Sequence, residues 1–186
     1  MWFESFVRAE TGCAAYMVGA HDSHECAVVD PLWDVEPYVR AAARKGARIR
    51  YVIDTHSHAD HVSGARRLTE ATGAELVLPE LAEVTYEATR VRDNDRIRLG
   101  EVSLDILHVP GHRPEQINVL VTDHSRSDDP WCLLTADFVL VGDVARPDLA
   151  QSGEEGARTL FDVAIPRLRS LPDFVEVYPG HVAGST

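Results

Sequence analysis

A cluster of three histidines and one aspartate separates two segments with different hydrophobic patterns. The cluster lies in residues 55–61, Thr-His-Ser-His-Ala-Asp-His. Before it, the apolar and β-branched residues of 50–55 predict a buried strand, and after it residues 62–68 predict the first turns of a helix. A strand that enters a helix through a short loop is typical of α/β folds, where functional side chains gather in such loops. We therefore expect an α/β domain with its chemistry at this loop.

The residue types in the cluster indicate a metal site. In an extended segment, residues two apart point to the same side, so His56 and His58 can share one face. Asp60 and His61 lie where the chain turns, so they can point to a neighbouring position. Without a cation, polar side chains packed this tightly would repel one another or lose hydration without compensation. Neutral imidazole and carboxylate suit Zn, Fe or Mn.

Length and charge limit the classes of function. The 186 residues are expected to form one domain over 1–186. The formal net charge of −12 argues against a protein that binds nucleic acid or an anionic membrane, but leaves small-molecule substrates open. We see no apolar run that could span a bilayer, and the amphipathic N-terminus lacks the layout of a signal peptide. The expected location is therefore the cytoplasm.

The three cysteines are isolated in the sequence and odd in number: Cys13, Cys26 and Cys132. No CxxC pair is present, so buried, reduced thiols are the simplest interpretation. A redox role for one of them is the weaker hypothesis.

Strand and helix patterns alternate along the chain. Three helices are expected: 34–44 with Asp34 as N-cap, 62–72 ending at Gly73, and a single helix over 154–169. We expect His21, His24 and His124 in solvated loops and His108 as a structural residue of a strand. Strands are expected at 2–8, 13–18, 26–30, 49–54, 75–78, 96–99, 102–109, 117–121, 131–134 and 175–178. Two strand-rich halves, each followed by helices, predict two sheets packed face to face with helices outside, a four-layer αββα sandwich.

Three further polar residues follow predicted strand ends. His112 comes after Val-Pro-Gly, Asp137 after the apolar run Leu-Leu-Thr-Ala, and His181 after Tyr-Pro-Gly. Each alone could be an ordinary turn residue. Their joint occurrence at three strand ends favours a single site that they share with the histidine cluster.

Together these motifs resemble the metallo-β-lactamase superfamily over essentially the whole chain. The resemblance implies an αββα sandwich with metals at the edge of the sheets. It also implies a ligand set, with His56, His58 and His112 at a first metal, Asp60, His61 and His181 at a second, and Asp137 bridging the two.

A finer resemblance concerns residues 141–149, Val-Gly-Asp-Val-Ala-Arg-Pro-Asp-Leu. This segment looks like the GDVGRPDL segment of persulfide dioxygenases, including those joined to rhodanese domains, and the ending 177–186 is similar to the same group. The resemblance implies one Fe(2+) per chain, held by His56, His112 and Asp137. Two histidines and one carboxylate are the arrangement of non-haem iron enzymes that use O2. The implied reaction oxidises a low-molecular-weight thiol persulfide, such as glutathione persulfide, to sulfite and thiol.

With one iron held by His56, His112 and Asp137, the resemblance implies a supporting role for the other four residues. They would orient the ligands or hydrogen-bond to metal-bound water: His58, Asp60, His61 and His181. Asp60 and Arg146 are the candidate catalytic residues. Arg146 would steady the anionic substrate or the loop around the site, and a plain salt bridge to Asp143 or Asp148 is the equal alternative. A homodimer and a sulfurtransferase (rhodanese) partner are compatible with the resemblance.

Some positions depart from the family pattern. Ala136 and Ala145 stand where glycine is usual, and Arg113 stands where threonine is common. The chain ends five residues after His181, whereas family members continue. We therefore expect part of the substrate-binding rim to lie outside this sequence.

Two other functions remain open from the sequence. The first is a glyoxalase-II-like thioesterase with Zn(2+), one or two per chain, because all seven ligands of a two-metal site are present. The segment 141–149 and the missing C-terminal region argue against it. The second is a metal-stabilised or sulfide-sensing binding module without turnover. A β-lactamase proper is disfavoured by the expected cytoplasmic location, and nucleic-acid processing by the charge.

Overall fold

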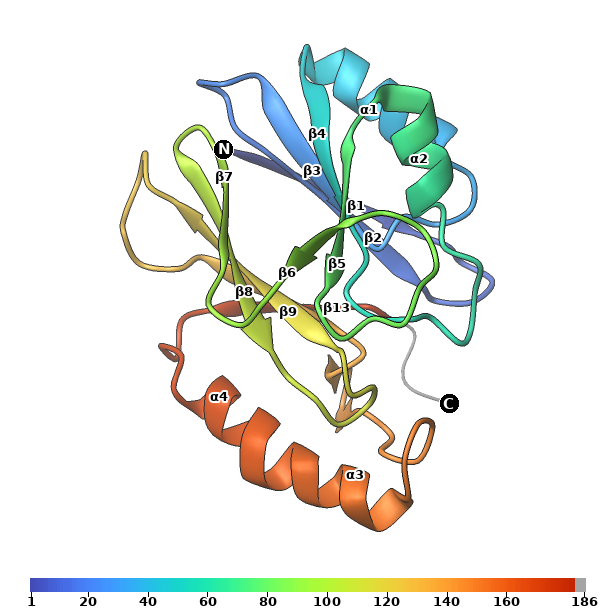
Figure 1. Cartoon of the computed structure of the whole chain (residues 1–186). Coiled ribbons are helices and arrows are strands. Elements are labelled where there is room, and N and C mark those ends of the chain that lie inside the picture. Colours follow the sequence, from blue (N-terminus) through green and yellow to red (C-terminus); the bar gives the residue numbers. More distant parts are fainter. Residues whose placement is uncertain (183–186) are drawn as a thin grey trace.

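Two β-sheets form the centre of the computed structural model, which describes residues 1–182 (Figure 1). The first sheet has six strands in the order β1-β2-β3-β4-β5-β6. Its first three strands pair antiparallel, and the pairs from β3 to β6 are parallel. Its strands are β1 (Trp2–Val7), β2 (Ala14–Gly19), β3 (Glu25–Val29), β4 (Arg48–Ile53), β5 (Glu75–Pro79) and β6 (Thr89–Val91).

The second sheet has five strands in the order β13-β10-β9-β8-β7. All of its pairs are antiparallel except β10 with β13. Its strands are β7 (Arg96–Leu99), β8 (Val102–His108), β9 (Ile117–Asp123), β10 (Cys132–Ala136) and β13 (Glu176–Pro179). A separate hairpin consists of β11 (Val139–Leu140) and β12 (Asp143–Val144).

The main hydrophobic core lies between the two sheets. Val18 and Val29 from the first sheet belong to one buried cluster with Leu104 and Val119 from the second. These side chains alternate with residues on the other face because successive strand residues point to opposite sides. Each fully buried apolar side chain contributes about 1.5–3 kcal/mol to the free energy of folding.

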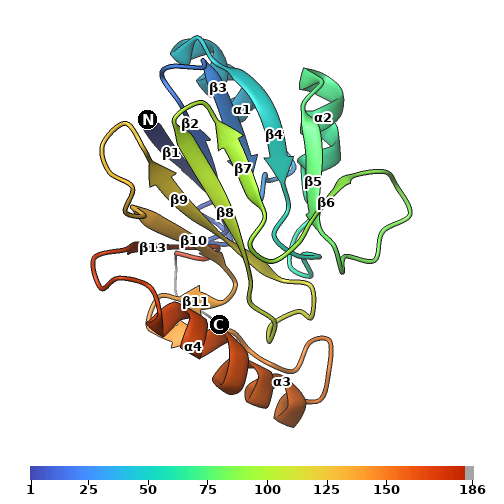
Figure 2. The same ribbon diagram turned by 60° about the vertical axis from the view of Figure 1, so that its left-hand side comes forward.

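Helices cover the outer side of each half of the sandwich (Figure 2). On the first sheet lie α1 (Glu36–Lys45) and α2 (Ala65–Thr72), which bury Tyr38 and Leu68 in a second cluster. On the other side lies a continuous helical segment of α3 (Gly153–Thr159), η1 (Leu160–Ala164) and α4 (Ile165–Arg169). Leu160 packs there with Val109 and Phe138. The αββα order of layers is as predicted.

Two helix starts differ from the prediction. Helix α1 begins at Glu36 after Val35, so Asp34 is not the N-cap, although its Oδ1 accepts a hydrogen bond from the Glu36 N–H at 3.3 Å. Helix α2 begins at Ala65 rather than at 62. The preceding residues are held as a loop because the Gly64 N–H donates to the Pro31 carbonyl at 2.7 Å and the Ser63 hydroxyl donates to Asp54 at 2.9 Å.

The predicted helix 154–169 contains a π-helical turn, η1, and starts at Gly153. Pro166 follows this turn and has no N–H for the regular helical hydrogen bond, a common cause of such irregularity. Ser152 caps the start through a capping box with Glu155. The sequence also missed β6, β11 and β12, which have only two or three residues each and thus too little periodicity to detect.

The cysteines and His124 can be compared with the sequence-based expectations. Cys13, Cys26 and Cys132 are buried and free, as predicted. His124 is not simply solvated, because its Nδ1 lies 2.7 Å from an Asp128 carboxylate oxygen and its Nε2 lies 3.0 Å from the Ser103 hydroxyl. Within residues 1–182, no helix is long and apolar enough to cross a membrane. Residues 183–186, the end of the family-like segment 177–186, lie outside the described residues.

Candidate metal centre

The candidate ligands lie where strands of both sheets end. His56 and His58 follow β4 of the first sheet, His112 follows β8 of the second sheet, Asp137 follows β10, and His181 follows β13. The two sheets are joined here, because the Ile117 N–H at the start of β9 donates to the Thr55 carbonyl at 3.0 Å. The residues predicted from distant motifs therefore meet at one edge of the sandwich.

His56, His112 and Asp137 form one compact group, with one ligand atom of each residue within 4.8 Å of the others. His56 Nε2 lies 3.7 Å and His112 Nε2 lies 3.4 Å from the same oxygen, Asp137 Oδ2. Both distances are longer than an ordinary hydrogen bond. Two ligand atoms that each lie about 2.1 Å from a shared ion are separated by roughly 3.0–3.4 Å, which is close to this spacing.

The other Asp137 oxygen faces a second group. Asp137 Oδ1 lies 3.4 Å from His181 Nε2, which in turn lies 3.3 Å from Asp60 Oδ2. His61 Nδ1 lies 3.1 Å from Asp60 Oδ1. The Cys13 thiol donates a hydrogen bond to Asp60 Oδ2 at 3.3 Å. Asp137 therefore lies between two groups of potential ligands.

His58 has a different environment. Its ring centroid lies 4.2 Å from that of His56, but its Nε2 lies 3.2 Å from Asp30 Oδ1. It forms a potential ligand group with Asp30 and Asp54 and another with Asp60 and His61. Although burial lowers the pKa of His58, the charge of Asp30 raises it to about 9. The structure thus places His58 beside a buried carboxylate rather than in the group with His56 and His112.

The sequence reasoning missed Asp30, Asp54 and Cys13. Asp30 is buried with a φ of 51° and accepts hydrogen bonds from the Thr55 N–H at 2.7 Å and from its hydroxyl at 2.8 Å. Burial raises the pKa of Asp54 to about 6. Their positions in the sequence could have indicated a place in the site, because Asp30 and Asp54 directly follow the neighbouring parallel strands β3 and β4.

The pKa values of the histidines shift in opposite directions in the two groups. Burial lowers the pKa of His56 and of His112, which keeps them in the neutral form that binds metals. Hydrogen bonds to Asp137 and Asp60 raise the pKa of His181 to about 10. The pKa of Asp60 is lowered by His181 and His61.

Unpaired buried nitrogens show that the residues fit a cation. In the described part of the chain, His56 Nε2 and His61 Nε2 are buried and have no hydrogen-bond partner. An unsatisfied buried polar atom costs about 1–3 kcal/mol, so such atoms are rare without a reason. Imidazole nitrogens and carboxylate oxygens around them are the donor set of Zn and Fe sites.

The candidate residue Arg146 and two positions that depart from the family pattern, Arg113 and Ala136, lie in the segments that follow or flank His112 and Asp137. Arg146 is exposed and forms a two-bond ion pair with Asp148 at 2.8 and 2.9 Å, which is one of the two alternatives expected for it. Arg113 lies 3.3 Å from Glu115, which accepts a hydrogen bond from the Ser57 N–H in the histidine loop. Ala136 has a φ of 46°, in the left-handed region that favours glycine.

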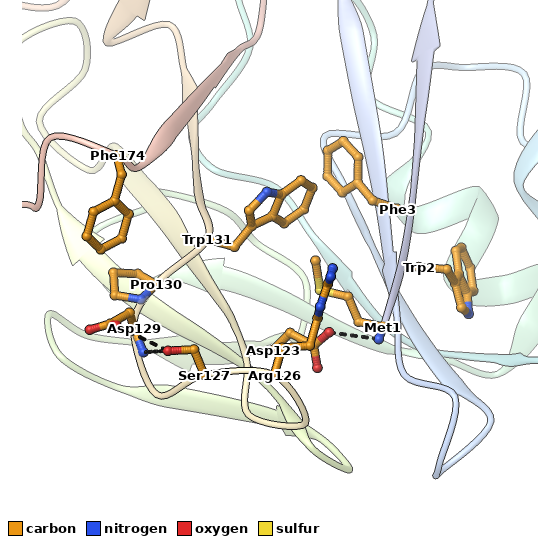
Figure 3. Close-up of a pocket in the computed structure, with 10 residues that line it drawn as sticks. All are labelled: Met1, Trp2, Phe3, Asp123, Arg126, Ser127, Asp129, Pro130, Trp131 and Phe174. Carbon is orange, nitrogen blue, oxygen red and sulfur yellow. Dashed lines mark hydrogen bonds and ion pairs between the residues drawn. The ribbon is translucent and has the colours of Figure 1, made fainter.

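A well-formed cavity lies away from this centre (Figure 3). It has a volume of about 590 Å³ and is lined by aromatic residues that include Phe3, Trp131 and Phe174. Trp131 precedes β10 and Asp137 follows it, so the cavity and the centre lie at opposite ends of this strand. At about 3.3 Å per residue, the strand separates them by roughly 20 Å.

A model of the Metallo-beta-lactamase superfamily matches residues 8–181, a range that contains every candidate ligand. The chain belongs to this superfamily. Its fold is shared with a metallo-beta-lactamase from Staphylococcus aureus at a TM-score of 0.92 and 33% identity, over 99% of this chain and 57% of that one. It is also shared with ETHE1 from Myxococcus xanthus at a TM-score of 0.84 and 28% identity, over 100% and 78%.

Two groups of relatives differ in reaction. The chain is 29% identical to the human mitochondrial persulfide dioxygenase ETHE1, over 89% of this chain and 62% of that protein. It is 30% identical to a hydroxyacylglutathione hydrolase from Polaromonas sp. (strain JS666 / ATCC BAA-500), over 89% and 60%. The chain therefore spans about three fifths of the length of these relatives. Both are members of a superfamily of metal-dependent enzymes, and they catalyse different reaction types.

Proposed function

We propose that this chain is a persulfide dioxygenase that uses one Fe(2+) to oxidise a low-molecular-weight thiol persulfide with O2 to sulfite and thiol. The observation that carries the proposal is the compact group of His56, His112 and Asp137, in which two imidazoles face one carboxylate oxygen. Two histidines and one carboxylate are the donor set of non-haem iron enzymes that use O2. The similarity to ETHE1 from human and from Myxococcus xanthus supports the same reaction.

The three residues would hold iron with positions left open, and iron would supply the place where O2 and the terminal persulfide sulfur meet. The protein's own contribution is orientation. The Thr55 hydroxyl lies 2.9 Å from His56 Nδ1, and the same hydroxyl donates to Asp30 at 2.8 Å, so a buried chain of contacts fixes the ring of His56.

Asp60 has a similar orienting role on the other side of Asp137. Its two oxygens face His61 at 3.1 Å and His181 at 3.3 Å. When the second group holds no metal, these contacts orient both imidazoles, which can then hold a substrate or a water molecule in place. Arg146 is proposed to release Asp148 and to contact the anionic substrate, since it follows the hairpin β11–β12 that comes after Asp137 and is exposed.

The test is to load the metal-free protein with one equivalent of Fe(2+) without oxygen and then to add glutathione persulfide and O2. We expect O2 uptake together with sulfite in equal amounts, and neither from zinc-loaded protein. Iron-loaded His124→Ala should give the same O2 uptake and sulfite as the unaltered protein, because His124 lies in the loop after β9 and pairs with Asp128 away from the centre. Iron-loaded protein that binds one iron and forms no sulfite would overturn the proposal.

A second candidate function is a two-metal thioesterase. The specific observation in its favour is that Asp137 faces His56 and His112 with one oxygen and His181 with the other. This is the placement of a carboxylate that bridges two ions, and the similarity to a hydroxyacylglutathione hydrolase supports it. Release of thiol from S-lactoylglutathione by protein with two Zn(2+), in the absence of O2, would favour this reaction.

The proposal also covers the reaction partners, the cellular location and the assembly of the enzyme. Its reaction partners are a small thiol persulfide and O2, its location is the cytoplasm, and a sulfurtransferase of the rhodanese type would supply the persulfide. Size-exclusion chromatography with light scattering tests the expected homodimer, and co-purification with the sulfurtransferase activity tests the partner.

A further inference from the structure

Cys13 is a potential ligand at the second group of the metal centre. Its sulfur, one oxygen of Asp60 and one ring nitrogen of His181 all lie within 4.8 Å of one another. Asp60 Oδ2 is at the centre of the three, at 3.3 Å from both the Cys13 Sγ and the His181 Nε2. The Cys13 side chain is buried, with only 3% of the residue exposed.

The backbone fixes Cys13 beside His181. The two residues pair in an isolated antiparallel bridge that joins the start of β2 to the end of β13. Hydrogen bonds flank this bridge on both sides, from the Ala14 N–H to the Gly180 carbonyl at 2.7 Å and from the Val182 N–H to the Gly12 carbonyl at 3.0 Å. The position of the thiol is thus set by main-chain contacts and not by a flexible loop.

We propose that Cys13 is a thiolate ligand of the second metal position, together with Asp60 and His181. The proposal rests on the metal centre described above but not on the dioxygenase reaction. Ligand atoms at about 2.1–2.3 Å from a tetrahedral ion are roughly 3.4–3.6 Å apart, close to the observed spacing of sulfur, oxygen and nitrogen. His61 contacts Asp60 through its Nδ1 at 3.1 Å, but its ligand atom groups with His58 and Asp60 rather than with Cys13 and His181.

The two metal positions would then differ in chemistry. The group of His56, His112 and Asp137 offers nitrogen and oxygen only, whereas the second position adds a soft sulfur. Thiolate ligands favour zinc-class ions, so the second position selects Zn(2+), Co(2+) or Cd(2+) over Mg(2+) or Mn(2+). When the ion binds, a sulfur–metal bond replaces the S–H bond of Cys13 and a nitrogen–metal bond replaces the Nε2–H bond of His181, so both protons are released to the buffer.

The experiment is a titration of the metal-free protein with Co(2+), followed by near-ultraviolet absorption. We expect a band of thiolate-to-cobalt charge transfer with the second equivalent of metal. The band should be lost in Cys13→Ala and in Cys13→Ser, and the affinity for the second equivalent of Zn(2+) should fall at least about tenfold. Cys26→Ala and Cys132→Ala are the matched controls, because both residues are buried free cysteines inside the strands.

A measurement on the unaltered protein keeps the test independent of how the variants fold. X-ray absorption at the zinc edge, on protein with two zinc ions, should show sulfur at about 2.3 Å with an average of about one half neighbour per zinc, since one of the two ions binds Cys13. Two bound ions with no sulfur neighbour, or a cobalt band that persists in Cys13→Ala, would overturn the proposal. Neither measurement uses iron, O2 or persulfide, so a failed dioxygenase assay leaves this result unaffected.

Discussion

Gly180 lies directly against the carboxylate of Asp137, so that a Cβ atom at position 180 would come within 2.7 Å of Asp137 Oδ1. The same Cβ would also lie 3.0 Å from the backbone of Ala136. The glycine before His181 therefore leaves room for the carboxylate between the two ligand groups. This explains the Pro-Gly-His pattern at 179–181 by a close contact.

Gly180→Ala is expected to displace Asp137 and weaken metal binding at least about tenfold, as changes beside metal ligands commonly do. Elemental mass spectrometry after dialysis against limiting metal gives the content, and competition with a chelating dye gives the affinity. Gly153→Ala is the control, because its Cβ would meet the nearest atom at an ordinary 3.7 Å. Equal metal content in both variants would contradict the steric explanation.

Ala136→Gly is expected to stabilise the protein. Ala136 has a φ of 46°, a conformation that costs a residue with a Cβ about 1–2 kcal/mol. Glycine loses more entropy on folding, which offsets about 0.5–1 kcal/mol, so the expected net gain is about 0.5–1 kcal/mol. Urea unfolding of metal-free protein measures it. Ala43→Gly on the exposed side of α1 should have the opposite sign, since glycine in a helix is unfavourable.

The ligand assignment predicts a difference between two sets of variants. His56→Ala, His112→Ala and Asp137→Ala should each abolish iron binding, because each removes one of three donors in the compact group. His181→Ala should leave one iron bound. The number of iron ions per chain, measured after anaerobic loading and desalting, distinguishes a one-iron centre from a two-metal centre. If His181→Ala halves a metal content of two, the centre has two metals and the thioesterase reaction gains support.

Arg146→Ala tests the role proposed for the segment 141–149. Arg146 and its partner Asp148 are exposed, so we expect no change in Tm. We expect a several-fold higher KM for the anionic persulfide with the iron content unchanged. Arg158→Ala is the matched control, since Arg158 forms a similar exposed pair with Glu154 in α3. The same KM in both variants would mean that Arg146 serves only its ion pair.

Asp93 gives a pH dependence that is independent of the metal centre. It precedes β7 and pairs with Arg167 of α4, which ties the last helix to the second sheet. Burial raises the pKa of Asp93, but the hydrogen bonds from Arg167 and from the His108 N–H, together with the charge of Arg167, outweigh it, and the net pKa is lowered. A lowered pKa in the folded state adds stability above the unfolded pKa of about 3.9, and this is lost as the pH falls through the folded value.

Asp93→Asn should therefore reduce the free energy of unfolding by about 1 kcal/mol at pH 7, with a smaller difference from the unaltered protein below pH 3. Urea unfolding at several pH values measures this. Asp162→Asn, on the exposed side of η1, should leave the pH profile unchanged. A constant difference between Asp93→Asn and the unaltered protein at all pH values would contradict a role for the charge.

The sequence predicted the two sheets and their helices because β8 begins with alternating apolar and polar residues and β9 contains a short apolar run bounded by polar residues. It also predicted that His112, Asp137 and His181 gather with the histidine loop, because each follows a strand end next to a turn. What it could not predict depends on contacts across the sandwich. Cys13 lies at the centre because an isolated β-bridge pairs its backbone with that of His181, and no local sequence pattern encodes this pairing.

The environment of His58 was unpredictable for a similar reason. Spacing places His56 and His58 on one side of an extended segment, but the segment after β4 is not extended. Asp30, from the neighbouring strand end, holds the Nε2 of His58 at 3.2 Å. Helix starts were missed by up to three residues where side chains such as Ser63 hold the chain in a loop.

The candidate ligands come from both halves of the sandwich, His56 from the first sheet and His112 and Asp137 from the second. A cation held by all three would act as a cross-link between the sheets, made after the chain has folded and broken whenever the metal leaves. Binding at a free metal concentration of 100 times Kd would add about 2.7 kcal/mol to the free energy of unfolding. The amount of intact protein in a cell would then follow the supply of its metal, so that starvation for the metal lowers activity and also shortens the lifetime of the chain.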